Sequence, residues 1–293
     1  MREKWKERAL LDEPLSGHTS WRVGGPCDLM VFPRDLEDLR EILIEAGREG
    51  VPLFVMGRGS NLLVRDGGIP GVVINLSRGL KEMEFGEEGL KAGAGVDLPL
   101  LALRAAQQGL SGLEFAAGIP GTVGGGIKGN AGAFGSSLDQ ILERVKILNG
   151  QGQENIFSRQ ELAFSYRRCL LPGEAVVVEA EFRLGQGEAG AIQRRMDALQ
   201  RKRQQSQPWQ ALTAGSVFKN PPGAYAGQII DSLGLKGKIM GRARVSPLHG
   251  NFIENLGDAR ASDLLQLIEL IRERAARELH IELELEIQVV GEE

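Results

Sequence analysis

The sequence predicts an α+β protein of two domains, and three observations support this. The chain has 293 residues, which is long for one domain and short for three. Its first half alternates short apolar runs with amphipathic stretches, as small βα units do. The composition then changes at residues 185–190, where glycines precede a charged helical segment. We therefore expect a lead-in over residues 1–18, a first domain over 19–187 and a second domain over 188–293.

Elements of the first domain follow from periodicity and turn residues. We expect the polar lead-in, residues 1–18, to be helical. Residues 35–48 place leucines on one helical face. Asp97 is the predicted N-cap of a helix over 97–108. Strands are expected over 52–56, 72–76 and 175–184, and a hairpin turn at Asn149-Gly150.

The second domain is predicted to contain two helices and a final strand. Residues 191–204 carry several arginines, which we assign to a solvated helix face. Residues 262–279 show leucine and isoleucine at helical spacing. Residues 281–289 alternate apolar residues with glutamates, as expected of a strand with one polar face.

Composition and charge exclude several classes of protein. The net charge of -4 argues against a general nucleic-acid binder, because surfaces that follow phosphates are basic. No run of about 18 apolar residues could span a membrane, and the charged N-terminal stretch lacks the apolar part of a signal peptide. Two cysteines and three histidines, scattered along the chain, predict no metal site. We expect a cytoplasmic monomer with neither nucleic acid nor membrane as a partner.

Residues 118–135 are the most informative stretch of the chain. Eight of these 18 residues are glycine, which permits positive φ and lets a ligand approach the main chain closely. The glycines alternate with Ile119, Val123 and Ile127, which suits a packed loop better than a flexible linker. Such a loop can direct several backbone N–H groups toward an anion such as a diphosphate.

A second glycine motif, GRGSNLL over residues 57–63, directly follows the predicted strand 52–56. It resembles the start of a dinucleotide fingerprint but lacks the third glycine and the acidic residue of that motif. It is not a Walker A loop either, since no Gly-Lys-Ser/Thr follows. Two such turns fit a ligand with one diphosphate and a large aromatic ring system, which points to FAD bound outside the Rossmann pattern.

Three polar residues leave their roles open when the residues are considered alone. Ser216 lies in AGSVFKNP, without a GxSxG elbow or a nearby histidine, so a structural serine is favoured over a hydrolase nucleophile. Arg167 either binds a carboxylate through two nitrogens or is a surface charge. Periodicity places Glu286 on the polar face of an edge strand.

Taken together, eight segments make the chain resemble the UDP-N-acetylenolpyruvoylglucosamine reductase family. They occur in the family's order and cover nearly the whole chain from residue 19. The segments are TSWRVGG (19–25), GRGSNLL (57–63), GLEFAAGIPGTVGGGIKGNAGAFG (112–135), SYR (165–167), AGSVFKNP (214–221), AGQIIDSLGLKG (226–237), VSPLHGNFIEN (245–255) and LELEIQVVG (283–291). Arg167 and Ser216 are 49 positions apart, which resembles the shorter, type II branch of the family.

The resemblance implies a flavin-binding fold of the vanillyl-alcohol-oxidase or p-cresol-methylhydroxylase type. Two α+β subdomains, approximately 19–78 and 79–187, would precede an α+β substrate domain. The implied reaction converts the enolpyruvyl ether of UDP-N-acetylglucosamine to UDP-N-acetylmuramate in peptidoglycan precursor synthesis. NADPH would reduce FAD, and hydride would pass from flavin N5 to the substrate's C3. We expect non-covalent FAD, because neither glycine-rich loop contains histidine or cysteine.

The resemblance also implies roles for the three open residues and replaces the edge-strand interpretation of Glu286. Ser216 would protonate C2, Arg167 would stabilise the developing enolate, and Glu286 would orient Arg167 or the substrate carboxylate. The implied substrate contacts are Tyr166, Lys219, Asn220, Lys236, His249 and Asn251. The implied FAD contacts are Gly57, Arg58, Gly59, Ser60, Asn61, Leu62, Gly118, Ile119, Pro120, Gly121, Thr122, Gly124, Gly125, Asn130, Ala131 and Gly132.

Two departures from the family pattern and two rival functions complete the prediction. Lys128, in the stretch 125–129, is expected to face solvent, and Gln288 stands where the family has an arginine. One rival is a sugar or alcohol oxidase on the same fold that uses O₂. The other is a regulator that binds a nucleotide sugar without catalysis.

Overall fold

The computed structural model describes Trp5 and residues 8–293, and the chain divides into two compact units. Unit 1 comprises Met1–Leu10, Leu29–Arg58 and Gly71–Lys202, and unit 2 comprises Leu11–Asp28, Gly59–Pro70 and Arg203–Glu293. Each unit is thus assembled from three segments of the chain. The predicted domain limits, 19–187 and 188–293, stay a prediction.

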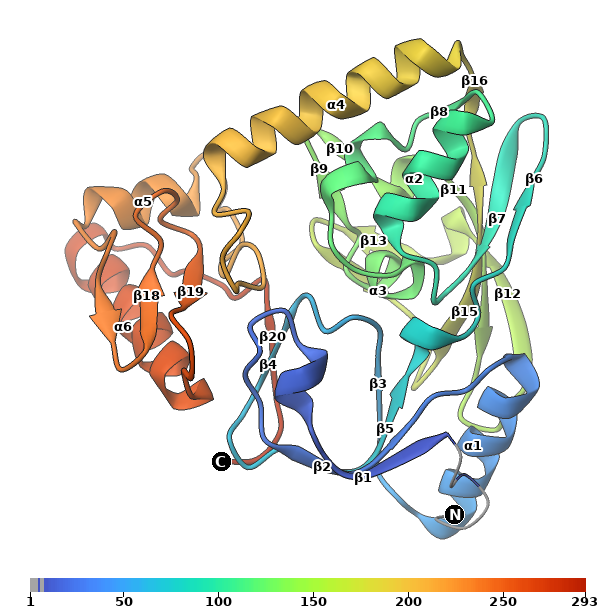
Figure 1. Ribbon diagram of the computed structural model, residues 1–293, viewed down its shortest axis with the longest axis horizontal. Coiled ribbons are helices and arrows are strands. Elements are labelled where there is room, and N and C mark those ends of the chain that lie inside the picture. Colours follow the sequence, from blue (N-terminus) through green and yellow to red (C-terminus); the bar gives the residue numbers. More distant parts are fainter. Residues whose placement is uncertain (1–4, 6–7) are drawn as a thin grey trace. The chain divides into compact units, whose positions relative to one another are not determined.

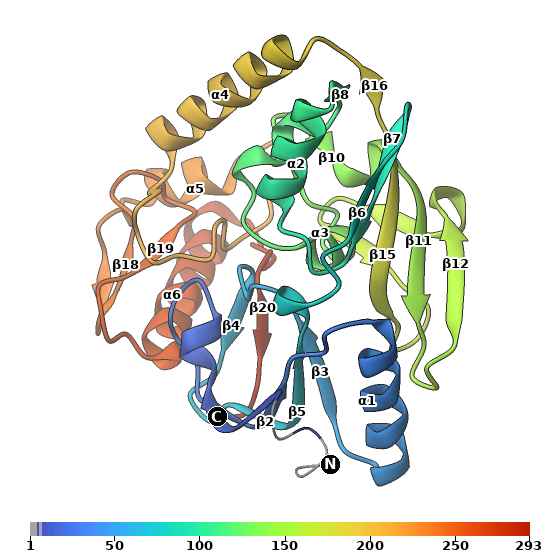
Figure 2. The same ribbon diagram turned by 45° about the vertical axis from the view of Figure 1, so that its right-hand side comes forward.

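A five-stranded antiparallel sheet lies in unit 1, with the strand order β12-β11-β15-β7-β6. Its strands are β6 (Met83–Phe85), β7 (Gly89–Gly93), β11 (Leu142–Leu148), β12 (Glu154–Ser158) and β15 (Val176–Arg183). The valines and alanine of β15 are buried, as expected of apolar β-formers in a central strand. Figures 1 and 2 show helices α2 (Leu98–Gln107) and α3 (Val123–Lys128) on one face of this sheet.

A four-stranded sheet has the order β1-β2-β5-β3, in which β3 and β5 are parallel. Its strands are β1 (Ala9–Pro14), β2 (Pro26–Val31), β3 (Leu53–Met56) and β5 (Ile69–Asn75). Helix α1 (Leu36–Glu49) leads from β2 to β3 and buries Leu39 and Ile42 with Val72 of β5. Asp35 caps its first turn, because a side-chain oxygen accepts the Asp38 N–H at 2.8 Å.

The remaining elements that lie wholly or partly in unit 1 are one long helix, several short strands and short 3₁₀ helices. Helix α4 (Ala189–Ser206) begins in this unit and ends in unit 2. The remaining strands pair two by two and are β8 (Leu110–Ser111), β9 (Gly132–Ala133), β10 (Ser136–Ser137), β13 (Ala163–Ser165), β14 (Arg168–Leu170) and β16 (Gly185–Gln186). Short 3₁₀ helices are η2 (Leu76–Arg78), η3 (Glu114–Gly118), η4 (Leu138–Gln140) and η5 (Arg159–Glu161).

Unit 2 has its own core around Trp21, which is fully buried and donates a hydrogen bond to the Ile253 carbonyl at 2.7 Å. A three-stranded sheet, β17-β18-β19, packs against helix α6 (Figure 1). A parallel pair, β20 with β4, holds the C-terminal residues. The elements are η1 (Leu15–His18), β4 (Leu62–Val64), α5 (Ala226–Ser232), β17 (Ile239–Met240), β18 (Ala243–Val245), β19 (Ile253–Asn255), α6 (Ala261–Leu279) and β20 (Gln288–Val290).

The N-terminus of α6 is capped by a residue almost 200 positions away in sequence. The carboxylate of Asp66 accepts the Ala261 N–H at 2.8 Å and the Ser262 N–H at 3.1 Å. We expect Asp66→Ala to lower the free energy of unfolding by about 1–2 kcal/mol, because it removes a cap and a negative charge from a helix N-terminus. Asp66→Asn, which keeps one accepting oxygen, should lose less. Urea unfolding of the two variants without FAD measures this, and equal stability of wild type and Asp66→Ala would contradict it.

Most predicted elements are confirmed within a few residues, including helices α1, α2, α4 and α6 and the hairpin of β11 and β12. The predicted helical lead-in is wrong for residues 9–14, which pair with β2. A short polar helix is marginal on its own, whereas strand pairing satisfies the backbone. The prediction for residues 1–4 and 6–7 lies outside the described residues.

The predicted strand over 281–289 is also largely wrong. Only Leu283 and Ile287 of its apolar residues are buried, and regular pairing begins at Gln288. Before it, the chain makes a single bridge between Leu285 and Phe218.

Candidate active site

The glycine-rich segment 118–135 forms a packed loop in unit 1 that contains α3. Hydrogen bonds from Val123 N to Val96 O at 2.8 Å and from Gly124 N to Ala94 O at 2.9 Å fix its backbone. Gly121 has a φ of +130°, which L side chains rarely adopt. Gly121 and Thr122 are buried, and no group in the described part of the chain accepts a hydrogen bond from their backbone N–H. Buried N–H donors of this kind fit an anionic group such as a diphosphate.

The first residue of the GRGSNLL motif lies against this loop. A Cβ at Gly57 would clash with the Thr122 hydroxyl and lie 3.1 Å from its Cγ2. Arg58 is exposed and forms an ion pair with Asp97 at 3.0 Å. Asp97 was predicted to cap α2, but its side chain makes no capping hydrogen bond. Its carboxylate pairs with the guanidinium of Arg58.

Arg167 lies in unit 1 at the turn of the β13–β14 hairpin. Ser165 pairs with Arg168, so Tyr166 and Arg167 form a two-residue turn, and Arg167 adopts a φ of 58°. The Arg167 guanidinium lies 5.3 Å from the ring centre of Tyr166, which is exposed. Asn130, a buried residue of the glycine-rich segment, donates to the Ser165 carbonyl at 3.0 Å. The Arg167 hairpin is therefore attached to the predicted cofactor loop.

Ser216 lies in unit 2, after Gly215 with its φ of 80°. It is half-buried, and its hydroxyl makes no hydrogen bond to another residue in the described ranges. The two residues that follow, Val217 and Phe218, are fully buried. A buried main chain thus follows a partly exposed hydroxyl.

Glu286 lies beside this segment in the same unit. Its N–H donates to the Val217 carbonyl at 2.8 Å. Its carbonyl accepts the side-chain N–H of Asn61 at 3.0 Å, and the Asn61 carbonyl accepts the Gln288 N–H at 2.9 Å. Glu286 is therefore hydrogen-bonded both to Val217, the residue after Ser216, and to the side chain of Asn61.

The remaining predicted substrate contacts also lie in unit 2, apart from Tyr166. Lys219 pairs with Glu284 at 3.1 Å and Lys236 with Asp231 at 2.7 Å. Asn220 is exposed, and its side-chain oxygen accepts the Ala226 N–H at 3.0 Å.

His249 is packed between the backbone of Gly227 and the ring of Phe252. Burial and the charge of Lys236 both lower the pKa of His249. Its neutral Nδ1 accepts the Asn251 N–H at 3.2 Å.

The structure gathers the predicted residues into two groups. In unit 1 they are Tyr166, Arg167, Gly57, Arg58, Gly118, Ile119, Pro120, Gly121, Thr122, Gly124, Gly125, Asn130, Ala131 and Gly132. In unit 2 they are Ser216, Glu286, Lys219, Asn220, Lys236, His249, Asn251, Gly59, Ser60, Asn61 and Leu62. Lys128 is exposed, as expected.

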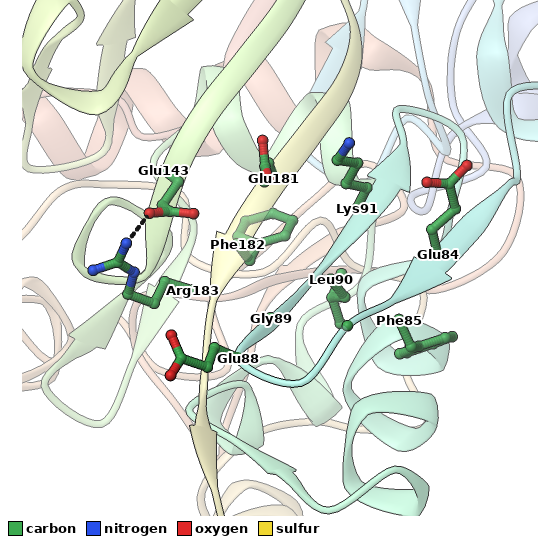
Figure 3. Close-up of a pocket in the computed structure, with 11 residues that line it drawn as sticks. Glu84, Phe85, Glu88, Gly89, Leu90, Lys91, Glu143, Glu181, Phe182 and Arg183 are labelled. Atoms are coloured by element: carbon green, nitrogen blue, oxygen red, sulfur yellow. Dashed lines mark hydrogen bonds and ion pairs between the residues drawn. The ribbon is translucent and has the colours of Figure 1, made fainter.

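A hollow of unit 1 lies along β6, β7 and β15 (Figure 3). It has a volume of about 330 Å³ and is rimmed by carboxylates, one of which, Glu143, pairs with Arg183. No predicted site residue lines it.

Three further properties of the described residues bear on the chemistry. They contain no group of three or more histidine, cysteine or acidic side chains that could hold a metal ion. None of their helices combines the length and the apolar character that crossing a membrane requires. Cys27 and Cys169 are buried, and burial raises the pKa of each thiol to about 11, so both stay protonated at neutral pH.

Two family models match the chain in succession. The model described as FAD binding domain matches residues 27–156. The model described as UDP-N-acetylenolpyruvoylglucosamine reductase, C-terminal domain, matches residues 207–290.

Named relatives match over nearly the whole chain. UDP-N-acetylenolpyruvoylglucosamine reductase of Moorella thermoacetica is 45% identical and covers 98% of this chain and 95% of its own length. The enzyme of that name from Halalkalibacterium halodurans is 42% identical, and the match covers 96% of this chain and 94% of the relative. The crystal structure of UDP-N-acetylenolpyruvylglucosamine reductase (MurB) from Thermus caldophilus matches with a TM-score of 0.84 and 40% identity. The match covers 97% of this chain and 98% of that structure.

The FAD-binding match, the packed glycine-rich loops and the mixed α/β fold define a flavin-dependent oxidoreductase with FAD as its cofactor. This confirms the predicted α+β, flavin-binding fold class. With relatives above 40% identity over the full length, the chain belongs to the UDP-N-acetylenolpyruvoylglucosamine reductase family.

The contact between Gly57 and Thr122 gives a test of the FAD site. We expect Gly57→Ala to lower the FAD content of the purified protein several-fold, because the new Cβ displaces Thr122 and its buried N–H donor. Adding Thr122→Ala removes the clashing hydroxyl and should restore the cofactor. The measurement is flavin absorbance relative to protein absorbance.

Gly47→Ala is the matched control, because a Cβ there meets only one atom, at an ordinary distance of 3.8 Å. This variant should keep its FAD. Full FAD content in Gly57→Ala, or a double variant as empty as the single one, would contradict the proposed contact.

Proposed function

We propose that this chain reduces the enolpyruvyl ether of UDP-N-acetylglucosamine to UDP-N-acetylmuramate, with NADPH as the reductant. The observation that carries the proposal is the succession of an FAD-binding match and a reductase C-terminal match in one chain. Relatives of the same length bear the reductase name. The reaction belongs to the synthesis of peptidoglycan precursors.

The cofactor's chemistry sets what the side chains must supply. Bound non-covalently and reduced by NADPH, FAD supplies a hydride to C3 of the enolpyruvyl group. Negative charge then develops at C2 and on the substrate carboxylate, and C2 needs a proton. The protein must therefore offer a cation for that charge and a proton donor.

Ser216 is the proposed proton donor to C2. Its hydroxyl is partly exposed and makes no hydrogen bond within the described residues, so its proton can be directed toward a ligand. An enolate is basic enough to take a proton from a hydroxyl. Positioned proton transfer of this kind accelerates a reaction by about 10²–10⁴-fold.

Arg167 is the proposed cationic partner of the substrate carboxylate, and Glu286 has a proposed orienting role. A guanidinium fixed where negative charge develops stabilises the transition state more than the ground state. Glu286 would orient Arg167 or the carboxylate. The ion-paired lysines, Lys219 and Lys236, lie partly exposed at the surface of unit 2, and we propose that they bind the diphosphate and sugar by exchanging their carboxylate partners.

Anaerobic absorbance spectroscopy tests the proposal. The yellow protein should bleach with NADPH and recover its colour when the UDP-enolpyruvyl sugar is added. Bleaching that only O₂ reverses would favour an oxidase. A protein that binds the UDP-sugar but is not reduced by NADPH would favour a regulator.

A further inference from the structure

The main chain after Ser216 is held on both sides. The Val217 N–H donates to the Asn251 carbonyl at 2.9 Å, and the Val217 carbonyl accepts the Glu286 N–H at 2.8 Å. The next residue, Phe218, pairs with Leu285 on one side. On its other side no strand is present among the described residues, and a single side chain takes the place of one.

That side chain is the amide of Asn251. Its Oδ1 accepts the Phe218 N–H at 2.9 Å, and its Nδ2 donates to the Phe218 carbonyl at 2.8 Å. With its main-chain bond to Val217, Asn251 makes three hydrogen bonds to the two residues that follow Ser216. Asn251 is only 3% exposed, so these bonds form away from water, where losing one is costly.

Asn251 is itself fixed from the other side. Its N–H donates to Nδ1 of His249, whose ring contacts Phe252 edge-on at 4.8 Å between centroids. Gly227 leaves the room that this ring occupies, since a Cβ there would lie 2.7 Å from the His249 Cε1. The amide of Asn251 therefore has a defined position, and both of its polar atoms are engaged.

We propose that Asn251 is the positioning residue for Ser216: its amide fixes Val217 and Phe218 and thereby sets the direction of the Ser216 hydroxyl. The inference rests on the proposed role of Ser216 as proton donor. Asn251 touches neither substrate nor cofactor in this role and acts through the main chain alone. A displacement of about 1 Å at a reacting group can cost about 10²-fold in rate.

Asn251→Asp is the sharpest variant, because it keeps the shape and the acceptor for the Phe218 N–H. It replaces the Nδ2 donor with a second carboxylate oxygen, and this oxygen repels the Phe218 carbonyl oxygen. Reduction of the bound FAD by NADPH should keep its rate. Reoxidation by the UDP-enolpyruvyl sugar should slow by about 10²-fold, with KM for the sugar changed less than kcat.

The solvent deuterium isotope effect on reoxidation distinguishes a positioning role from a purely structural one. When the Ser216 hydroxyl is misdirected, proton transfer limits reoxidation, and the solvent deuterium isotope effect on that step should rise. Asn255→Asp is the matched control, since Asn255 is also buried and also donates to a carbonyl, that of Trp21, at 2.8 Å. The same isosteric change there should lower the melting temperature without altering the isotope effect.

The outcomes separate the two hypotheses. If the wild type recovers its colour with the sugar and Asn251→Asp does so as fast as Asn255→Asp, with an unchanged isotope effect, the positioning role is refuted. If the wild type itself is not reoxidised by the sugar, the proposed function fails first. Should Asn251→Asp not fold, Asn251→Ser is measured instead, because its shorter side chain removes both amide hydrogen bonds to Phe218 and keeps the main-chain bond to Val217.

Discussion

Replacing Ser216 with alanine is expected to leave reduction of the FAD by NADPH at its wild-type rate. Recovery of the yellow colour with the UDP-enolpyruvyl sugar should slow by about 10²–10⁴-fold, because no other group would be placed to protonate C2. The fold should tolerate the change, since the hydroxyl makes no hydrogen bond among the described residues. Stopped-flow absorbance of the two half-reactions, measured separately, provides the test.

Two further serine variants sharpen this experiment. Ser216→Cys keeps an ionisable proton donor of lower pKa and should retain part of the reoxidation rate. Ser232→Ala, in helix α5 of the same unit, removes a hydroxyl whose one hydrogen bond within the described residues goes to Ile229 of its own helix, and it should behave as wild type. Wild-type reoxidation in Ser216→Ala would remove Ser216 from the chemistry and leave the proton to water or another residue.

The regular elements of the fold were predictable because each depends on local sequence. Helix α1 follows from leucines at helical spacing, with Asp35 before it and Gly50, at a φ of 63°, after it. The predicted strand over 281–289 was largely wrong because a strand also depends on a partner that local sequence does not show. Alternation shows that two faces differ, but it does not supply the neighbouring strand that a ladder needs.

The roles of three asparagines could not be predicted from the sequence. Asn61, Asn130 and Asn251 each donate to a main-chain carbonyl, at separations of 225, 35 and 33 residues. The resemblance to a family marked them as ligand contacts, since all three lie in its motifs. Only the folded chain shows that their amides hold the backbone beside Glu286, Arg167 and Ser216.

Replacing Arg167 with alanine is expected to slow reoxidation by the UDP-enolpyruvyl sugar by about 10²–10³-fold, as for the loss of one fixed electrostatic group at a developing charge. kcat should fall more than KM rises, because the charge on the carboxylate grows toward the transition state. Arg167→Lys keeps the charge but cannot form two parallel hydrogen bonds, so its rate should lie between those of alanine and wild type. The same stopped-flow assay measures both variants.

Arg168 provides the matched control, because it is the next residue of the same hairpin and is exposed. Its guanidinium carries the same charge, so a general effect of net charge on binding an anionic sugar would appear in Arg168→Ala as well. A loss confined to Arg167→Ala shows that the position counts, as the turn geometry and the Asn130 hydrogen bond to Ser165 imply. Equal losses in both variants would show that the hairpin only attracts the ligand, and Arg167 would then have no special part in stabilising the enolate.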